Sequence, residues 1–403
     1  MRICLVSREY PPETGGIGTQ TFLKAHALTG VGNAVHVVTA EHDADAGNSL
    51  DGEVVLHRLV DPSSDRRRDG VDPTSRLPLQ WAAYSQTVAA KLYELNEQER
   101  FDVIEFAEYG AEGFVYELDT SERRDVPVAV MLHGSLAMFA ERGGWPAPGS
   151  PLHRFGTFME ETVVRGADLL LAASRNIANF WIERGVPHER IHVVHTAVDP
   201  AAFMPSDAQR DGEIEVLFVG RIDGEKGVFD VVKALGALAP RYPTLRCRIV
   251  GSGKPVDEKH LREMIEASGA PAQFEVVGPV PHDQLPHYYA SCDVFAAPAP
   301  RDHGVSSVYL EAMSCGKPVI ASFSGGAPEA VVDGQTGLLV PPRDPAALVE
   351  ALDTLLADRH LRDRLGRKAR ARVLEHFSPE RMIARVVEAY AEVLSNRPLW
   401  KSR

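Results

Sequence analysis

Cysteine is scarce in this chain, and the few that occur are too widely spaced to form a metal site. The four residues Cys4, Cys247, Cys292 and Cys315 include no close pair of the kind that binds metal. Three of them lie in or beside apolar runs, which predicts buried thiols in a reducing compartment. We therefore expect a cytoplasmic protein.

The sequence also lacks a long apolar run and a surplus of positive charge. No segment approaches the length that spans a bilayer, and the apolar run within residues 1–12 is too short for a signal peptide. A formal net charge of -13 disfavours nucleic acid as a partner, so local cations and helix ends must meet any anionic ligand. We expect no nucleic-acid partner and no stable membrane insertion. The sequence does not decide whether the tail 397–403 makes loose contact with a membrane or whether the protein is a homodimer.

The length and order of the segments predict two doubly wound α/β domains. The chain has 403 residues, more than one hydrophobic core normally serves. Strand, glycine-containing loop, helix and strand follow one another within residues 2–39, and a similar order restarts at Glu215. The proline-containing run Thr196–Pro205 and the polar stretch after it predict the connection. We expect domains at 1–200 and 201–378, followed by a helix within 379–403.

Short apolar runs predict the buried strands, and periodic runs predict helices. The expected strands are Arg2–Ser7, Val35–Thr39, Phe101–Phe106, Val126–Leu132, Asp168–Ala172, Ile191–Val194, Glu215–Gly220, Arg246–Gly251, Phe274–Gly278, Cys292–Ala297, Pro318–Ala321 and Gly337–Val340. The expected helices are Thr21–Leu28, Trp81–Leu95, a helix from Ser306 to a stop at Gly316, residues 345–377 and Pro379–Leu394. Residues 61–78, with three arginines at 66–68, are expected to form an exposed excursion.

The stretch Ala299–Pro328 predicts an anion site. A strand ends before it, and a helix begins near Ser306, at the sheet edge where parallel sheets bind ligands. The first turn of that helix leaves the backbone N–H groups of Ser306, Ser307 and Val308 available to a phosphate. Glu311, one turn further, is placed to accept hydrogen bonds from a pair of sugar hydroxyls. Together these features favour a sugar nucleotide as ligand.

Two glycine-containing loops were compared with known phosphate loops. Gly15, Gly16 and Gly18 follow the first strand, where backbone N–H groups can approach a phosphate closely. The dinucleotide fingerprint that starts at Gly16 fails, because its sixth place is Thr21, so a nicotinamide enzyme is disfavoured. The sequence GSGKP from Gly251 also fails as a phosphate loop, since Pro255 stands where serine or threonine is required.

The stretch around Glu311 resembles the donor-binding signature of family 4 of the retaining, nucleotide-sugar-dependent glycosyltransferases, which have the GT-B fold. The family has two glutamates separated by seven residues; the second falls on Glu311, and the first falls on His303. The missing glutamate normally contacts the donor sugar. Either Asp302 supplies a carboxylate one residue out of register, or His303 donates a hydrogen bond instead.

The resemblance covers nearly the whole chain and implies roles for further residues. It implies two Rossmann-like domains facing each other across a cleft, with the C-terminal helix crossing back to the N-terminal domain. Arg221 and Lys226 fall on the residues that hold the donor pyrophosphate and stabilise the leaving nucleotide. His133 falls on a loop that reaches the donor sugar. The remaining implied positions are Gly15 and Gly16 in the glycine-rich loop, Gly278 and Val280 at the nucleotide base, and Glu108 and Tyr109 on the acceptor side.

The implied activity is transfer of a sugar, without cofactor or metal, from a UDP or GDP sugar to an acceptor small molecule, lipid or glycan. Two other interpretations are a pseudo-glycosyltransferase or epimerase, and a nucleotide-sugar-binding protein without activity. The histidines His188, His192 and His195 invite a metal site. The last two belong to an expected strand, where a spacing of three places side chains on opposite faces, so we expect no metal.

Overall fold

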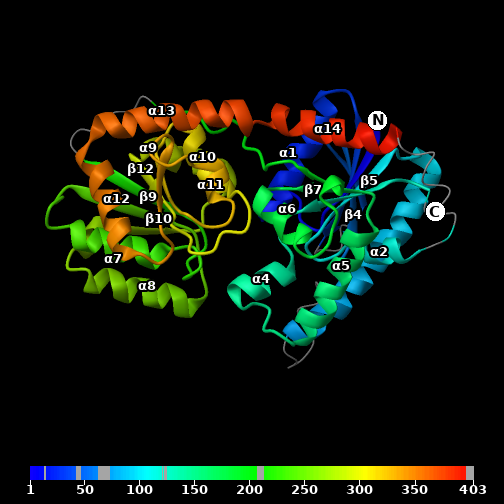
Figure 1. Ribbon diagram of the computed structural model, residues 1–403, viewed down its shortest axis with the longest axis horizontal. Coiled ribbons are helices and arrows are strands. Elements are labelled where there is room, and N and C mark those ends of the chain that lie inside the picture. Colours follow the sequence, from blue (N-terminus) through cyan, green and yellow to red (C-terminus); the bar gives the residue numbers. More distant parts are fainter. Residues whose placement is uncertain are drawn as a thin grey trace. The chain divides into compact units, whose positions relative to one another are not determined.

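The chain folds into two compact units. The computed structural model describes residues 1–12, 15–41, 47–61, 73–119, 121, 125–206 and 213–395. The first unit comprises Met1–His195 together with the residues from Pro379 on, and the second comprises Thr196–Ser378. Each unit contains one mainly parallel sheet with helices, which confirms the expected pair of Rossmann-like α/β domains (Figure 1). The arginine triplet at 66–68 and the tail 397–403 lie outside the described residues.

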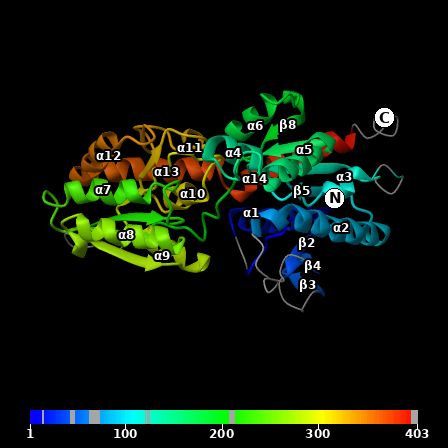
Figure 2. The same cartoon turned by 90° about the horizontal axis from the view of Figure 1, so that it is seen from below.

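The first unit is built on an eight-stranded sheet in the order β3-β4-β2-β1-β5-β6-β7-β8. Its strands are β1 (Arg2–Val6), β2 (Ala34–Glu41), β3 (Gly47–Asp51), β4 (Val54–Val60), β5 (Val103–Ala107), β6 (Val128–Leu132), β7 (Leu169–Ala172) and β8 (Ile191–Val193). Neighbours pair in parallel, except that β3 is antiparallel to β4 at the sheet edge seen in Figure 2. Every residue of β5 and β6 is buried, which explains why β6 is apolar throughout and why β5 is apolar except at Glu105.

Helices α1 and α14, from opposite ends of the sequence, belong to the same unit. The helices of this unit are α1 (Gly16–Gly30), α2 (Pro73–Glu99), α3 (Phe114–Leu118), α4 (Leu136–Gly143), α5 (Thr157–Gly166), α6 (Arg175–Ile182) and α14 (Pro379–Ser395). Glu105 on β5 joins α1 and α14 through its two carboxylate oxygens. Lys24 Nζ lies 2.6 Å from Glu105 Oε1, and the Tyr390 hydroxyl donates to Glu105 Oε2 at 2.6 Å. All three side chains are buried, so this charged cluster fixes both helices to the sheet.

The second unit has a fully parallel six-stranded sheet in the order β11-β10-β9-β12-β13-β14. Its strands are β9 (Ile214–Val219), β10 (Leu245–Val250), β11 (Phe274–Gly278), β12 (Val294–Ala296), β13 (Val319–Ser322) and β14 (Gly337–Val340). Its helices are α7 (Val228–Leu238), α8 (Pro255–Ala267), α9 (Leu285–Ser291), α10 (Ser307–Ser314), α11 (Ala327–Ala330), α12 (Pro345–Ala357) and α13 (Arg359–His376). Figure 1 shows α7 and α8 on one side of the sheet and α9, α10 and α13 on the other.

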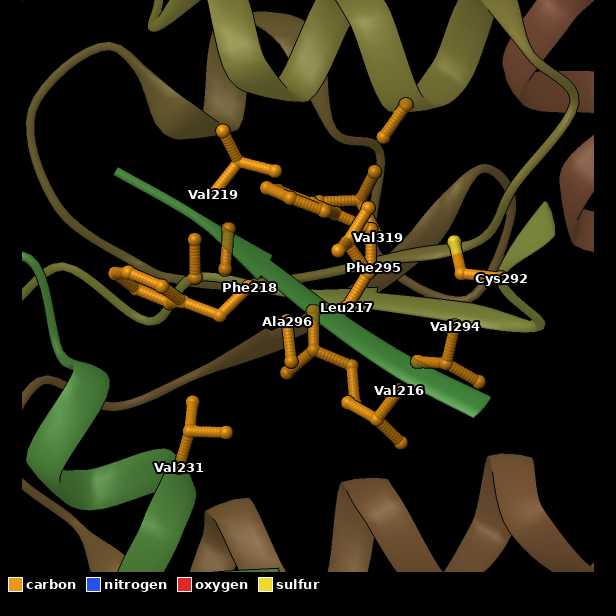
Figure 3. Packing of buried hydrophobic residues seen from close by; sticks show 14 of the residues in the cluster. Val216, Leu217, Phe218, Val219, Val231, Cys292, Val294, Phe295, Ala296 and Val319 are labelled. Atoms are coloured by element: carbon orange, nitrogen blue, oxygen red, sulfur yellow. The ribbon is translucent and has the colours of Figure 1, made fainter. Parts of the chain in front are cut away.

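The core of the second unit lies on both faces of β9 and β12. Figure 3 shows side chains of β9, from Val216 to Val219, projecting to opposite sides of the strand, with Phe295 of β12 beside them. Val216, Leu217 and Phe218 are completely buried. A central parallel strand that is covered on both faces is apolar at successive positions rather than alternate ones. The packed core holds the ends of β9 and β12, where the loops begin, in fixed positions.

Two of the differences from the expectation lie within residues 47–99. Strands β3 and β4 were not predicted, because β3 has the polar sequence GNSLD and is largely exposed at the sheet edge. Helix α2 begins at Pro73, eight positions before the expected start at Trp81, so the predicted excursion ends earlier than residue 78. A proline at the first helical position is compatible with a helix because its missing N–H needs no partner there.

Candidate functional site

In the second unit, the candidate residues gather where the strand order reverses. β9 lies between β10 and β12, and the chain passes first to β10 on one side and later to β12 on the other. The loops that follow β9 and β12 therefore leave the sheet next to each other. In open α/β sheets this switch point is where ligands bind.

The loop after β9 has a defined shape. Asp223 Oδ1 accepts hydrogen bonds from the backbone N–H groups of Glu225 (2.9 Å) and Lys226 (3.0 Å). Gly227 has φ of 80°, and a Cβ atom there would lie 2.5 Å from the carbonyl oxygen of Pro298. Only glycine allows this backbone conformation and this close approach to the segment after β12. The two loops are thereby held together.

Arg221 and Lys226, both predicted from the sequence, extend from this loop. Arg221 is 71% exposed at its side chain, and its Nε lies 3.2 Å from Asp223 Oδ2. The Lys226 ammonium lies 3.5 Å from Asp302 Oδ1 in the loop after β12. Asp302 is buried, and its other oxygen accepts from the Tyr309 hydroxyl. Asp302 therefore has the geometry of an anchor for Lys226.

Two further arginines, not singled out from the sequence, lie beside this loop. Arg301 Nη1 is 3.5 Å and Arg343 Nη2 is 3.9 Å from the same carboxylate oxygen of Glu225. Arg343 comes from the segment after β14, so sequence distance hides it from any local motif. The switch point thus gathers four cationic side chains from three separate loops, and each of them lies beside a carboxylate.

Helix α10 begins at Ser307, with Ser306 as its N-cap residue. Among the described residues, the Ser306 hydroxyl makes no capping bond to the first turn. Ser306, Ser307 and Val308 are partly exposed, whereas the helix is buried from Tyr309 on. The N–H groups of this turn, together with the helix dipole, offer a place for an anion.

Glu311 lies in α10 with its carboxylate almost fully covered. Its Oε2 accepts from the Tyr289 hydroxyl at 2.7 Å, and its Oε1 lies 3.2 Å from His282 Nε2. The bond to Glu311 raises the pKa of His282 above its usual value, against the opposing effect of burial. Neither Tyr289 nor His282 was predicted as a site residue.

The loop that carries His303 packs tightly against Gly325 and Gly326. His303 is partly exposed, between the buried Asp302 and Gly304. A Cβ atom on Gly326 would lie 2.3 Å from the carbonyl carbon of Gly304, and one on Gly325 would lie 1.6 Å from the carbonyl oxygen of Asp302. The two glycines therefore set the path of the loop.

Gly278 and Val280, predicted at the nucleotide base, follow β11. Gly278 has φ of 87°, and its carbonyl accepts from the N–H of Gly251 at 2.8 Å. Val280 packs partly buried against the core of the second unit. The turn that contains them leads directly to His282 and so toward Glu311.

The first unit has a switch point of its own, between β1 and β5. The loop after β1 and the turn after β5 meet there, because the Arg8 N–H donates to Glu112 Oε1 at 2.7 Å. Gly15 is the N-cap residue of α1, and Gly16 is the first residue of that helix. The N–H of Gly15 donates to Glu9 Oε2 at 3.0 Å, so an internal carboxylate already lies at this helix terminus.

Glu108 is completely buried beneath the loop that carries His133. Its Oε2 accepts from the N–H of Gly134 at 2.8 Å, and its Oε1 accepts from Trp181 Nε1 at 2.6 Å. Burial raises its pKa to about 7, although the hydrogen bonds from Gly134, from Trp181 and from the backbone of His133 oppose the shift. Glu160, also buried, accepts from the N–H of Leu136 at 2.7 Å. Two carboxyl groups thus hold the segment between β6 and α4.

His133 is half-buried and lines a small recess together with Lys24, Glu105 and Met382. Burial, assisted by the charge of Lys24, lowers its pKa to about 3. Its imidazole is therefore neutral near pH 7 and retains one N–H donor. Tyr109 is partly exposed and packs edge-on against Trp81 at a ring-centroid distance of 5.6 Å.

The described residues contain no group of three or more His, Cys, Asp or Glu side chains that could hold a metal ion. His192 Nε2 lies 3.7 Å from Glu392, whereas Nδ1 of His195 lies 3.1 Å from Arg385. The four cysteines are buried and unpaired by disulfides. Within the described ranges, no helix combines the length and the apolar character that a membrane span requires.

Comparison with known proteins identifies related chains over nearly the full length. The family model described as "Glycosyltransferase Family 4" matches residues 14–202, and the model "Glycosyl transferases group 1" matches residues 201–372. A D-inositol 3-phosphate glycosyltransferase from Paenarthrobacter aurescens is 32% identical over 73% of this chain and 74% of its own length. The glycogen synthase of Mycobacterium tuberculosis is 28% identical over 97% and 94% of the two chains.

Solved structures share the fold at lower identity. Sucrose-phosphate synthase from Thermosynechococcus elongatus has a TM-score of 0.82 at 21% identity, covering 98% of this chain and 99% of that one. Anabaena Alr3699/HepE in complex with UDP-glucose has a TM-score of 0.70 at 20% identity, covering 97% and 100%. The sequence matches and the two Rossmann-like units agree with each other: the chain belongs to glycosyltransferase family 4 and has the GT-B fold.

Proposed function

We propose that this glycosyltransferase is retaining and metal-independent, and that it moves a sugar from a nucleotide-diphosphate sugar to a hydroxyl or other nucleophile of an acceptor. The observation that carries the proposal is the position of Arg221 and Lys226 after β9, with Lys226 3.5 Å from the loop that leads into α10. A departing diphosphate gains negative charge. Cations that are already in place stabilise that charge, so a metal ion is not needed.

Each candidate residue of the second unit receives a role in donor binding. Arg221 and Lys226 bind the diphosphate, and the N–H groups of Ser306, Ser307 and Val308 at the start of α10 assist them. Glu311 accepts hydrogen bonds from the two adjacent hydroxyls of the ribose. Gly278 and Val280 contact the base through backbone groups. The UDP-glucose complex of HepE supports a UDP sugar as donor, and a GDP sugar is the alternative.

His303 is the residue that we assign to the donor sugar in place of the usual glutamate. Asp302 is the less suitable candidate, because its buried carboxylate already bonds to Tyr309 and pairs with Lys226. A neutral histidine has one donor and one acceptor nitrogen, so His303 can donate to a sugar oxygen, which an ionised glutamate cannot do.

For the first unit we propose an acceptor-binding role. His133, as a neutral imidazole, donates to a hydroxyl of the sugar, and Gly15 and Gly16 approach the phosphates. Tyr109 contacts the acceptor, and Glu108 supports the His133 loop from below. The product is a glycosylated small molecule or glycan made in the cytoplasm. The acceptor is a small molecule, a lipid or a glycan.

A screen of nucleotide sugars by thermal shift, followed by product analysis, tests this proposal. We expect a UDP or GDP sugar to raise the melting temperature, and nuclear magnetic resonance to show the donor's anomeric configuration kept in the product. Excess EDTA should leave the rate unchanged. An inverted product, or a rate that is lost with EDTA and restored by a divalent cation, would contradict the assignment.

His303 also favours a second candidate, a catalytically altered member of the fold. Because the residue at this position normally contacts the donor sugar, its replacement is compatible with a pseudo-glycosyltransferase, an epimerase or a protein that only binds nucleotide sugars. Calorimetry that shows nucleotide-sugar binding without transfer or hydrolysis, across a wide acceptor panel, would support the binding protein. Mass spectrometry of the products separates the epimerase and the pseudo-glycosyltransferase from a sugar transferase.

The substitution Gly326→Ala should lower kcat/KM about 10²-fold, which steady-state kinetics measures. The φ of Gly326 is −86°, so alanine tolerates the backbone conformation, but its Cβ would meet Gly304 at 2.3 Å. The loop of His303 must then move, and a displacement near 1 Å at a reacting centre costs about this factor. Gly30→Ala, where no atom lies within 4 Å of the added Cβ, is the control. Equal kinetics in both variants would show that the loop does not act in turnover.

A further inference from the structure

The carboxylate of Glu311 has one partner inside the protein and one toward solvent. Tyr289 is completely buried, and its hydroxyl donates to Oε2 at 2.7 Å from the interior. His282 is 44% exposed at its side chain, and its Nε2 lies 3.2 Å from Oε1. The Glu311 side chain itself is only 4% exposed. His282 is therefore the partner that stands between this carboxylate and the solvent.

The His282 ring lies on a short turn and packs against Phe203. It lies in the short 3₁₀ turn His282–Gln284, which follows Pro279, Val280 and Pro281. One edge contacts the buried ring of Phe203, at a centroid distance of 5.6 Å and an interplanar angle of 64°. A partly exposed ring on a short turn can rotate away at a smaller cost in free energy than the ring of Tyr289, which is buried and belongs to helix α9.

The charges around His282 favour its protonated form. An ionised Glu311 can only accept, so Nε2 of His282 must donate to it. The charged groups that face the ring are Glu311 from α10 and Asp283 from its own turn, and Tyr289 of α9 lies behind the carboxylate. Both carboxylates raise the pKa of His282, and the hydrogen bond to Glu311 is the largest cause.

We propose that His282 is a displaceable partner of Glu311. When the ribose of a nucleoside diphosphate binds to Glu311, the His282 ring moves away from the carboxylate. Nucleotide binding therefore releases a proton from His282. The inference rests on the proposed role of Glu311 as the ribose acceptor. Two ribose hydroxyls need lone pairs on both oxygens of Glu311. Tyr289 can remain as a second donor to Oε2 from behind, but His282 occupies the solvent-facing approach to Oε1. His282 is thus a positioning residue that controls access to Glu311.

The expected pH dependence follows from linkage. The pKa of His282 is raised while it bonds to Glu311 and returns toward its ordinary value near 6.5 when it is displaced. Nucleotide affinity therefore increases as the pH rises from about 6.5 to the raised pKa, and it levels off above that pKa. Each unit by which the pKa falls on binding weakens the affinity about tenfold at the acidic end of this range.

Titration calorimetry of the full chain with UDP and GDP, at several pH values and in buffers of different ionisation enthalpy, measures the proton release. The substitution His282→Gln keeps one N–H donor but cannot titrate. We expect the wild type to release up to about one more proton than this variant near pH 7, and the variant to bind more tightly than the wild type near pH 6. Protons that the phosphate groups of the nucleotide gain or lose on binding contribute equally in both proteins, so they cancel when the two proteins are compared.

Two controls isolate the ribose contact. His287→Gln, at an exposed position five residues further along, should behave as the wild type. A dideoxynucleoside diphosphate, which lacks both ribose hydroxyls, should release the same number of protons from the wild type and from His282→Gln. Equal proton release by both proteins with UDP or GDP bound would overturn the role of His282. If no nucleotide binds at any pH, the proposed function fails, and this inference fails with it.

Discussion

We expect the replacement of Lys226 or Arg221 by alanine to lower kcat by about 10²–10³-fold each, the loss typical of removing one preorganised group that stabilises transition-state charge. In the proposed mechanism the diphosphate becomes more negative as it leaves the sugar, so these cations should bind it more strongly in the transition state than in the ground state. Consequently KM for the donor changes less than kcat. Steady-state kinetics with the donor from the thermal-shift screen measures both parameters.

The two variants should remain folded. Arg221 is mostly exposed, and removing Lys226 leaves Asp302 with its hydrogen bond from Tyr309. Lys259→Ala on α8 is the matched control, because Lys259 is 76% exposed and makes only a surface pair with Glu263 at 3.6 Å. Near-normal kcat in the Lys226 and Arg221 variants would remove the basis of the proposed mechanism.

Glu108→Gln should destabilise the first unit at pH 5 by about 1–3 kcal/mol. Trp181 Nε1 and the N–H of Gly134 donate to different oxygens of Glu108. Both oxygens can accept even when the carboxyl group is protonated, whereas the amide nitrogen of glutamine cannot. One buried donor therefore loses its partner. The His133 loop also loses support, so kcat should fall as well. Residues 196–378 contain no tryptophan, so urea unfolding followed by tryptophan fluorescence reports on the first unit.

The difference in the free energy of unfolding between Glu108→Gln and the wild type should become smaller as the pH rises. The folded pKa of Glu108 is about 7, above its ordinary value of 4.5, so the native state binds more protons between these pH values. The corresponding stability is present below pH 4.5 and is lost as the pH rises toward 7, by about 3 kcal/mol in total. The Glu108→Gln variant cannot lose a proton at this position, so its stability does not fall in this pH range for that reason. If the difference in unfolding free energy stays constant from pH 5 to 8, the raised pKa of Glu108 is refuted. Glu189→Gln, at an exposed site, is the control.

The central strands of both sheets could be predicted because they are buried on both faces. Runs such as that of β9 are apolar at successive positions and leave little ambiguity. The edge hairpin of β3 and β4 escaped prediction since β3 depends on its neighbour rather than on its own apolar residues. Loops at strand ends were also predictable, and they contain Arg221, Lys226 and His133.

The contacts that orient these residues could not be predicted. Asp302 lies 76 positions from Lys226 in sequence, and Tyr390 lies 285 positions from Glu105. Such pairs depend on which strands become neighbours, and no local pattern encodes that. The hydrogen bond from Tyr309 to Asp302, which bears on our proposal for His303, likewise appears only in the folded chain. No sequence pattern connects His282, an isolated histidine at the start of a short turn, with Glu311.

Helix α14 has a consequence for how the protein is made. The ribosome synthesises residues 1–195 first, yet the buried Glu105 in that stretch acquires its hydrogen bond from Tyr390 only after the whole second unit has been translated. Until then the first unit must persist with an incomplete core. A premature stop codon just after Ser378 would therefore damage the part of the protein that was translated earliest.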